Sequence, residues 1–284
     1  MKSIFFAALC AFPGFAFAQK ASGKILFAKG QQIEVVTNMN ISAQSMMGPS
    51  SGTITAADTY TVSEAGPGSF TLLKVPKQMK MNFSVGSQEI KIDSDNPKDL
   101  SSTFGQPIKD IMNNKLEFTI DQTGKITSVK KDPKKKKDDQ SGSGMMGMML
   151  PGMDMTSAIP QEGTPSVFQV LPAYEVGVGD TWTDSLQQEG NKNVTVYTVK
   201  NITDNEIILD FRGEGITVTT QSAMGMNIAV NATTKATGNI IVEKNTGIVK
   251  QKTSTNTTES TMNLGGREVT STIKSTAVTN VNKR

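Results

Sequence analysis

The stretch 60–83, YTVSEAGPGSFTLLKVPKQMKMNF, aligns without gaps to the stretch 197–220, YTVKNITDNEIILDFRGEGITVTT. The two copies share the tripeptide Tyr-Thr-Val at their start and keep apolar residues at alternate positions. The alignment pairs Phe70 with Ile207, Leu72 with Leu209, Met79 with Ile216, Met81 with Val218, and Phe83 with Thr220. Alternation of this kind is typical of strands with one buried face. A repeated unit predicts one β-rich body built from two related halves.

Further alternation outside the repeat predicts more strands, at Ile33, Val35 and Thr37 and at Val269, Ser271, Ile273, Ser275 and Ala277. Two hairpins are expected, each with a Thr-Gly turn. The first joins Phe118 and Ile120 to Ile126 through Gly124, and the second joins Ile240 and Val242 to Ile248 or Val249 through Gly247. Glycine at such turns usually adopts a positive φ.

Helical signals are few and short. We expect helices at 99–104, 107–113 and 164–171, because Pro107 and Pro165 suit the first turn of a helix. The predicted fold class is therefore mainly β, a β-rich α+β protein. A curved antiparallel sheet, or half-barrel, is formed by two related halves and covered by short helices.

The N-terminus predicts export. Lys2 precedes an almost wholly apolar run at 4–17, and Ala16-Phe17-Ala18 matches the small-x-small pattern that signal peptidase reads. We expect a signal peptide at 1–18, a first β-rich half at 19–131, a flexible Lys/Asp/Gly/Met-rich linker at 132–161, and a second half at 162–284 in the same folded body. No later segment has the roughly 20 apolar residues of a spanning helix. The mature chain is expected to be periplasmic or extracellular, or associated with the envelope.

Composition argues against catalysis and against nucleic-acid binding. The chain has no histidine, one cysteine (Cys10, inside the expected signal peptide) and a formal net charge of +3. The commonest general base and zinc ligand are therefore missing, and a nearly neutral chain lacks the basic character of nucleic-acid-binding proteins. Asp93-Ser94-Asp95 begins like a calcium loop, but Pro97 and Lys98 interrupt it. We expect no enzyme activity, no cofactor, and no catalytic or metal-binding residues.

The string 176–182, VGVGDTW, is the most distinctive short motif. Together with Leu171-Pro172, the triplet 93–95 and the Thr-Gly hairpins, it resembles an uncharacterised family of exported Gram-negative proteins that is known only as a domain of unknown function. That family resembles the half-barrel class of lipoprotein carriers and lipid-binding envelope proteins. The resemblance spans most of the mature chain and implies a fold, but its motifs imply no mechanism.

These features predict a non-catalytic envelope protein that binds an apolar ligand, a lipid or acyl chain, in the concave face of the sheet. The candidate lining residues are Leu72, Met79, Met81, Leu209, Ile216, Val218 and Trp182. The expected partners are a lipid or lipoprotein, or another envelope protein. A structural or protein-interaction module is the alternative. Cu(I) binding is a third hypothesis, based on the thioethers of 145–155, Met46-Met47, Met224 and Met226.

Overall fold

The structure is a computed structural model that describes residues 20–45, 48–130, 160–188, 190–223, 226–264 and 267–284. The expected signal peptide and residues 131–159 of the linker lie outside the described residues. So do Met46, Met47, Met224 and the methionine-rich stretch 145–155. The predictions of export and of copper binding therefore stay predictions.

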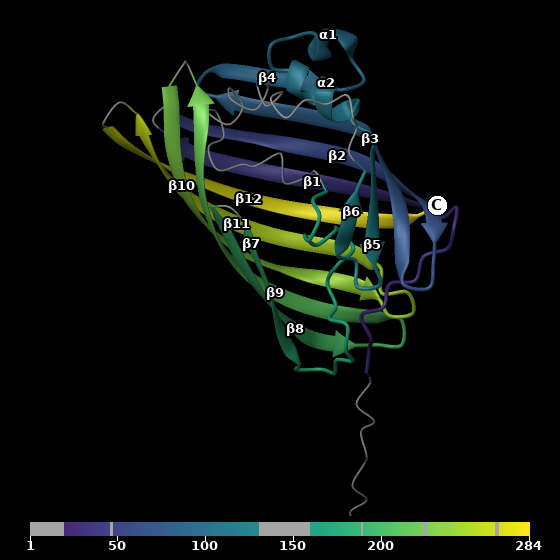
Figure 1. Ribbon diagram of the computed structural model, residues 1–284. Coiled ribbons are helices and arrows are strands. Elements are labelled where there is room, and N and C mark those ends of the chain that lie inside the picture. Colours follow the sequence, from purple (N-terminus) through teal and green to yellow (C-terminus); the bar gives the residue numbers. More distant parts are fainter. Residues whose placement is uncertain (1–19, 46–47, 131–159, 189, 224–225, 265–266) are drawn as a thin grey trace, which may run out of the picture.

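The described chain forms one curved, twelve-stranded antiparallel sheet that does not close into a barrel (Figure 1). The strands of the first half are β1 (Gln32–Ser45), β2 (Gly48–Ala65), β3 (Ser69–Val85), β4 (Gln88–Asp93), β5 (Leu116–Asp121) and β6 (Ile126–Val129). Those of the second half are β7 (Thr181–Gln188), β8 (Asn191–Ile202), β9 (Glu206–Ala223), β10 (Met226–Glu243), β11 (Val249–Leu264) and β12 (Arg267–Lys283). The order across the sheet is β6-β5-β3-β2-β1-β12-β11-β10-β9-β8-β7, and β4 pairs with β3 beside β5. This confirms the predicted fold class.

The two hairpins of the sequence repeat have the same register. Val62 lies opposite Leu72 in the β2–β3 hairpin, and Val199, 137 residues later, lies opposite Leu209 in the β8–β9 hairpin. One extra residue follows each of these valines and forms a bulge at the same place. Because bulges and registers are specific features of a strand pair, the two halves are related in structure as well as in sequence.

The equivalence extends to the strands before each hairpin. The Gly30 N–H donates to the Val62 carbonyl at 2.8 Å, and the Gly179 N–H donates to the Val199 carbonyl at 2.9 Å. Both glycines have a positive φ, 82° and 91°. These turns start β1 and β7 in the same register, so β7 is the counterpart of β1. The β5–β6 and β10–β11 hairpins also match, with a bulge in each and positive φ at Gly124 and Gly247. Within the described residues, β12 has no counterpart in the first half.

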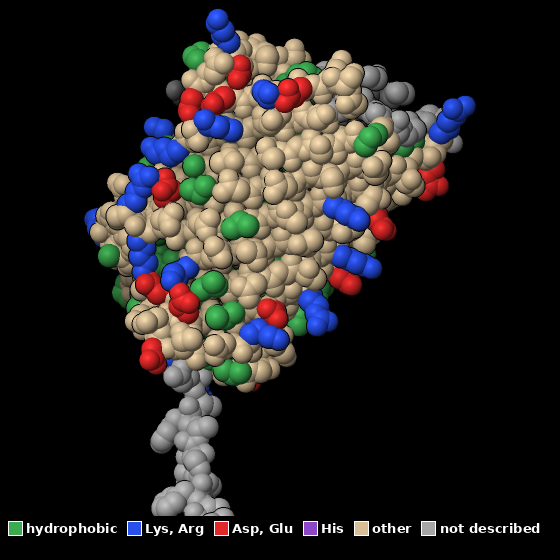
Figure 2. Space-filling view, turned by 180° about the vertical axis from the view of Figure 1, so that it is seen from behind, with side chains coloured by type: hydrophobic (Ala, Val, Ile, Leu, Met, Phe, Trp, Pro, Cys, Tyr) green, Lys and Arg blue, Asp and Glu red, His purple; other side chains and the backbone are tan. Residues whose placement is uncertain are grey.

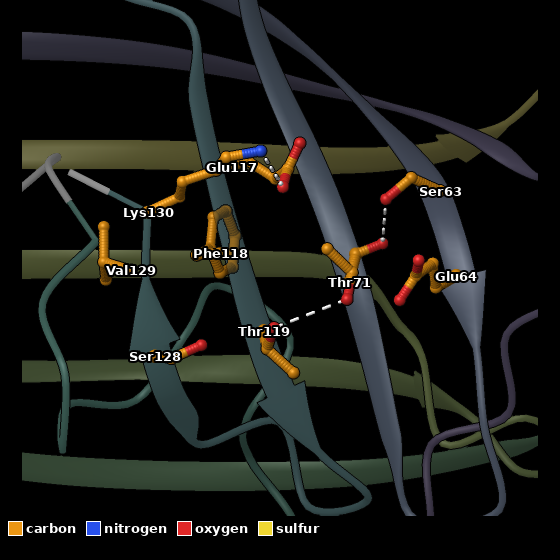
Figure 3. Close-up of a pocket in the computed structure, with 9 residues that line it drawn as sticks. All are labelled: Ser63, Glu64, Thr71, Glu117, Phe118, Thr119, Ser128, Val129 and Lys130. Carbon is orange, nitrogen blue, oxygen red and sulfur yellow. Dashed lines mark hydrogen bonds and ion pairs between the residues drawn. The ribbon is translucent and has the colours of Figure 1, made fainter. Parts of the chain in front are cut away.

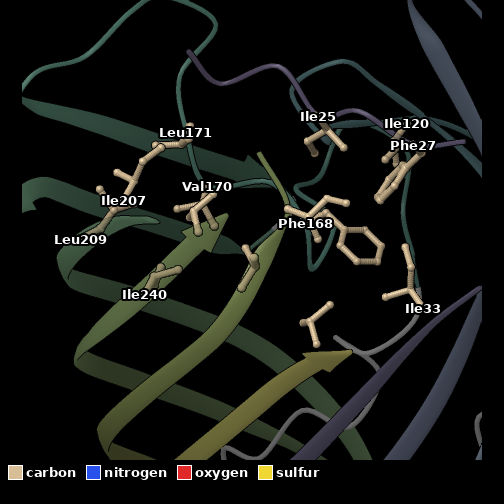
Figure 4. Packing of buried hydrophobic residues seen from close by; sticks show 14 of the residues in the cluster. Ile25, Phe27, Ile33, Ile120, Phe168, Val170, Leu171, Ile207, Leu209 and Ile240 are labelled. Carbon is tan, nitrogen blue, oxygen red and sulfur yellow. The ribbon is translucent and has the colours of Figure 1, made fainter. Parts of the chain in front are cut away.

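Two large apolar clusters and a small one, formed by Ile228, Val230 and Met262, lie on the concave face of the sheet. The larger one forms where the N-terminal segment 20–31 and the segment 160–180 pack against strands of both halves (Figure 4). Phe168 is 1 % exposed at its centre, and its ring meets Phe27 and Tyr60 edge-to-face at 5.2 and 5.3 Å. The second cluster lies between β1–β4 and the two helices α1 (Pro97–Leu100) and α2 (Gln106–Met112), around Ile108.

The expected helix at 164–171 is wrong. Pro165 forms an isolated β-bridge with Lys125, and the Ser166 hydroxyl accepts a hydrogen bond from the Phe168 N–H at 3.2 Å. Tertiary contacts thus hold this segment in an irregular conformation that inserts Phe168 into the core. The helix predicted at 99–104 is shorter and begins earlier, at Pro97–Leu100, and the helix predicted at 107–113 exists one residue earlier, at Gln106–Met112. The Asn96 side chain caps α1 by accepting from the Lys98 N–H at 3.1 Å.

The convex face is polar and carries few charges at its centre. In Figure 2, which views the molecule from behind, blue and red side chains gather mainly toward the margins. The outward positions of β11 and β12 are mostly threonine and asparagine: Thr253, Thr255, Thr257, Thr261, Asn263, Thr270, Thr272, Thr276 and Asn280. In the described part of the chain, no helix is long and apolar enough to cross a membrane.

Candidate functional site

The structure does not bring the seven predicted lining residues together. Leu72 and Leu209 are 0 % exposed and belong with Trp182 to the larger core cluster. Met81 belongs to the second cluster, with Met79 packed against it under the helices. Fully buried leucines are core residues. The five side chains therefore lie in two separate parts of the interior.

Ile216 and Val218 lie on the opposite face of the sheet from Leu209, and each is 52 % exposed. The sequence alignment predicted the wrong face for these two residues because β3 has a bulge that β9 lacks. Lys77 is an extra residue between Pro76 and Gln78, so the inward positions of β3 shift by one after it, whereas β9 pairs with β8 and β10 without interruption in this region. A shift of one residue turns every following side chain to the other face. The sequence pairing with Met79 and Met81 therefore does not hold in space.

A row of aromatic side chains crosses the concave face of the second half. Trp182, Tyr197 and Phe211 stand directly opposite one another on β7, β8 and β9. The Trp182 and Tyr197 rings stack at 5.3 Å, and Tyr197 and Phe211 are 6.3 Å apart. The Phe211 ring lies over Gly238 of β10, where a Cβ atom would come within 2.5 Å of it. The buried Trp182 Nε1 has no hydrogen-bond partner among the described residues.

Lys252 of β11 holds its ammonium 4.9 Å from the centre of the Phe211 ring. It faces inward, because it stands opposite the fully buried Ile240. Desolvation by neighbouring protein groups lowers the pKa of Lys252 below the ordinary lysine value, while the residue as a whole is exposed to solvent. Among the described residues no carboxylate forms a salt bridge with Lys252.

Asp184 adds an acidic group to the same face, two residues after Trp182. Burial raises the pKa of Asp184, and burial together with the nearby Asp184 charge raises the pKa of Tyr197 to about 12. The positions beside Asp184 on the next three strands carry short side chains or none, at Thr195, Gly213 and Ala236. We define Lys252, Phe211, Tyr197, Trp182 and Asp184 as the concave site. Its chemistry suits binding of a charged ligand.

The corresponding part of the first half is electrostatically compensated. Tyr60 is the repeat counterpart of Tyr197, and Lys74 stands where the second half has Phe211. The Lys74 ammonium lies 3.1 Å from the Asp58 carboxylate, and Lys74 is 8 % exposed. Burial, followed by the charge of Asp58, raises the pKa of Tyr60. One half thus pairs its inward charges internally, whereas the concave site does not.

Sequence reasoning found Trp182 and missed the rest of the concave site. The available signal was a charged residue at a position that strand alternation assigns to the core. Lys252 follows the inward Val249 after the Gly247 turn, but the bulge at Lys250 obscures its face. Asp184 is two residues after Trp182 and thus on the same face. The alignment did not indicate Phe211 as an apolar inward position, because it pairs Phe211 with Lys74.

A stability measurement tests the cost of burying Asp184. Because its pKa is raised in the folded state, the folded protein holds this proton more tightly than the unfolded chain, and stability falls as pH rises above the ordinary aspartate range. Asp184→Asn should therefore raise the melting temperature at pH 7 by a few degrees and change it little at pH 3. Glu214→Gln, on the outward face, is the matched control for thermal unfolding at both pH values. A gain of equal size at both would contradict the assignment.

A separate pocket of about 360 Å³ lies on the other face of the first half, over β2, β3, β5 and β6 (Figure 3). Its lining is Ser63, Glu64, Thr71, Glu117, Phe118, Thr119, Ser128, Val129 and Lys130. Lys130 donates to Glu117 at 3.1 Å, and the hydroxyls of Thr71 and Thr119 lie 3.4 Å apart. These polar groups largely bind one another. The pocket therefore does not fit the apolar ligand that the sequence predicted.

The Asp93–Asp95 triplet forms a turn. The Asp93 carboxylate accepts from the Asp95 N–H at 2.9 Å and pairs with Lys80 at 2.9 Å. The Asp95 N–H and the Lys80 ammonium both lower the pKa of Asp93. Among the described residues, no group of three His, Cys, Asp or Glu side chains is placed to hold a metal ion.

Solved structures that are similar to this chain include an outer membrane channel and two other bacterial proteins, all at low sequence identity. An outer membrane channel from Pseudomonas putida F1 is 7% identical, with 96% of this chain and 100% of that chain covered and a TM-score of 0.26. OccK5 (OpdH) of Pseudomonas aeruginosa is 8% identical, with coverages of 90% and 100% and a TM-score of 0.20. The translocator domain of the autotransporter NalP from Neisseria meningitidis is 7% identical, with 90% of each chain covered and a TM-score of 0.21. At these scores the likenesses support no inference about this chain, and none of the three is described as a lipoprotein carrier.

Family membership rests on a sequence model. No curated protein matches the chain. The model of a family of unknown function matches residues 67–249, from the β2–β3 turn to the start of β11, which is more than half of the chain. This range includes the aromatic row but ends before Lys252. The protein belongs to the family of unknown function DUF6263.

Proposed function

We propose that this protein is a non-catalytic, exported envelope protein that binds an apolar ligand with an anionic group, of the fatty-acid or lipid class, at the concave site. The observation that carries the proposal is Lys252. Its ammonium faces the concave side, lies over an aromatic ring and forms no salt bridge within the described residues.

Moving a cation from water toward a protein interior is unfavourable unless an opposite charge compensates it. The Phe211 ring supplies only part of that compensation, of the order of 1 kcal/mol. An anionic group at the ammonium would supply the remainder and raise the pKa of Lys252 again.

The surrounding surface supports an apolar portion of the same ligand. The aromatic row borders the larger core cluster, so one side of the concave site is apolar. Gly213, Gly238 and Ala236 keep the neighbouring inward positions short. Binding sites for small amphiphilic molecules typically combine an apolar wall with a few placed polar groups.

The test compares a fluorescent fatty acid with its methyl ester, which lacks the negative charge. Lys252→Met should weaken binding of the acid by about tenfold or more, because a charge-assisted hydrogen bond contributes about 1.5–3 kcal/mol. Binding of the ester should be weaker than that of the acid and unaffected by the substitution. Lys235→Met, on the outward face of β10, is the matched control and should bind like the unaltered protein. Equal binding of acid and ester by the unaltered protein would overturn the proposal.

The lowered pKa of Lys252 makes a second prediction about the same site. Anion binding requires the protonated amine. Affinity for the fatty acid should therefore fall as pH rises from neutral to alkaline values, starting below the ordinary lysine pKa of 10.5. A fluorescence titration at several pH values measures this trend. The methyl ester should show no such pH dependence, and a parallel decline for both ligands would assign the effect to unfolding.

A further inference from the structure

The β7 strand leaves one edge of the sheet without a partner strand among the described residues. It runs for eight residues, Thr181–Gln188, and pairs on its other side with β8. Edge strands usually carry features that prevent pairing with another chain, such as lysine, proline, a bulge or an inward-pointing charge, and of these β7 has only the inward-facing Asp184. The β7 sequence, TWTDSLQQ, contains neither lysine nor proline, and its pairing with β8 is regular.

The opposite edge of the sheet is treated differently. The β6 strand has four residues, Ile126–Val129. Its free side is partly occupied, because the Ile126 N–H donates to the Thr164 carbonyl at 2.9 Å and the Gly163 N–H donates to the Ile126 carbonyl at 2.8 Å. The chain thus protects the β6 edge with its own backbone.

The internal repeat shows what an equivalent edge accepts. The β7 strand is the counterpart of β1, since each begins after the same glycine turn and pairs in the same register with its hairpin. In β1, the edge that corresponds to the free edge of β7 is occupied by β12, which pairs antiparallel over twelve positions from Ile33 to Gln44. An edge of this geometry therefore binds an antiparallel strand within this same protein.

The backbone groups that would bind the additional strand can be assigned. The Val199 N–H donates to the Asp180 carbonyl at 2.9 Å, so Asp180 is directed at β8. Because residues of an antiparallel strand alternate between their two neighbours, the N–H and C=O groups of Thr183, Ser185 and Gln187 point to the free edge. The equivalent of Thr181 in the first half is Gln32, whose carbonyl accepts from the Arg284 N–H at 3.0 Å beside β12.

We propose that the β7 edge binds an extended segment of a partner protein by antiparallel strand addition, and that this segment places a lysine or arginine opposite Asp184. Asp184 is the one charged residue of β7, it faces the concave side, and it has no hydrogen-bond or ion-pair partner among the described residues. Main-chain hydrogen bonds supply affinity in strand addition, and alternate side chains supply specificity. The proposed strand addition does not require a ligand at Lys252, although Asp184 also belongs to the concave site.

The β12 sequence provides a probe with a known register. A synthetic peptide of residues 267–283 reproduces the strand that occupies the equivalent edge of β1, where Val281 stands opposite Val35. Val35 corresponds to Asp184. A peptide that carries Val281→Lys should therefore bind the full protein more tightly than the unaltered peptide, by about 1.4- to fivefold, since an opposite-charge pair across two strands contributes about 0.2–1 kcal/mol. A scrambled peptide of the same composition should not bind.

Three variants of the protein separate the possible outcomes. Ser185→Pro removes an N–H directed at the free edge, in a position where an edge strand tolerates proline, and should abolish peptide binding. Ser185→Thr retains the N–H and should preserve binding. Asp184→Asn should remove the advantage of the Val281→Lys peptide while leaving the unaltered peptide bound. Circular dichroism establishes that each variant is folded.

Several results would overturn the proposal. The proposal is wrong if either peptide fails to bind the unaltered protein. It is also wrong if the peptides bind folded Ser185→Pro as tightly as they bind the unaltered protein. If the protein dimerises without peptide and Ser185→Pro makes it monomeric, the occupant of the edge is a second copy of this chain. Loss of fatty-acid binding in Lys252→Met together with normal peptide binding would show that the two sites act separately.

Discussion

Replacing Leu209 by alanine is expected to lower the free energy of unfolding by about 2–5 kcal/mol, the range observed when a large aliphatic side chain is removed from a packed core. Leu209 is 0 % exposed on β9 and belongs to the cluster that joins both halves and the segment 160–180 (Figure 4). Several elements that surround the cavity would have to move to fill it. Chemical denaturation followed by tryptophan fluorescence measures the change, because Trp182 belongs to the same cluster.

Ile216→Ala is the matched control on the same strand. Ile216 is 52 % exposed and faces outward, so its truncation should change the free energy of unfolding by about 0.5 kcal/mol or less. The sequence alignment placed both residues on one apolar face. A large loss of stability in Ile216→Ala, or a small one in Leu209→Ala, would contradict the assignment of faces that follows from the uninterrupted register of β9.

The second large effect is expected at Gly238. A Cβ atom there would lie 2.0 Å from the Thr253 carbonyl oxygen and 2.5 Å from the Phe211 ring. The first contact involves backbone, so β10 and β11 would have to separate locally. Gly238→Ala should lower the free energy of unfolding by about 3 kcal/mol, at the upper end of the usual cost of overpacking. It should also weaken fatty-acid binding, because Phe211 and Lys252 would be displaced.

Gly213→Ala distinguishes this contact from a general effect of glycine in strands. Gly213 lies on β9 with the same inward orientation, and a Cβ atom there would meet Thr195 Oγ1 at 3.3 Å and Ala236 Cβ at 3.5 Å. Small adjustments of side chains accommodate these distances. The substitution should be close to neutral in denaturation, or slightly stabilising, because alanine loses less backbone entropy than glycine. A loss in Gly213→Ala as large as in Gly238→Ala would contradict this explanation.

The difference between the two halves supports the proposed site in the second half. Both halves contain the same turn, strand and hairpin unit, yet the first pairs Lys74 with Asp58 and covers its sheet with α1 and α2. The second leaves Lys252 and Asp184 without ion-pair partners in the described chain. Unpaired, partly desolvated charges lower stability. Lys252 and Asp184 lie in the second half only, and a ligand that compensates such a charge would explain why they are there. This difference supports ligand binding at the concave site.

Local pattern was sufficient for most strands and turns. Two-residue alternation predicted β1 and β12, and the Thr-Gly pairs predicted the hairpins at Gly124 and Gly247, because these signals depend on neighbouring residues alone. The repeat was found from the alignment of 60–83 with 197–220. The faces that this alignment predicted are wrong for the residues paired with those after Lys77. The bulge at Lys77 changes the face of every later residue of β3, and residue composition does not reveal a bulge.

The sequence by itself determined an antiparallel β protein with two related halves, because strand alternation and glycine turns are short-range properties of the chain. The tertiary structure alone decided which apolar residues are core, that 164–171 inserts Phe168 without forming a helix, and that Lys252 comes to lie over Phe211 across two strands. These outcomes depend on bulges, on strand order and on contacts between residues far apart in the chain. The free edge of β7 is likewise a property of the assembled sheet, because a strand becomes an edge only through the order in which all the others pair.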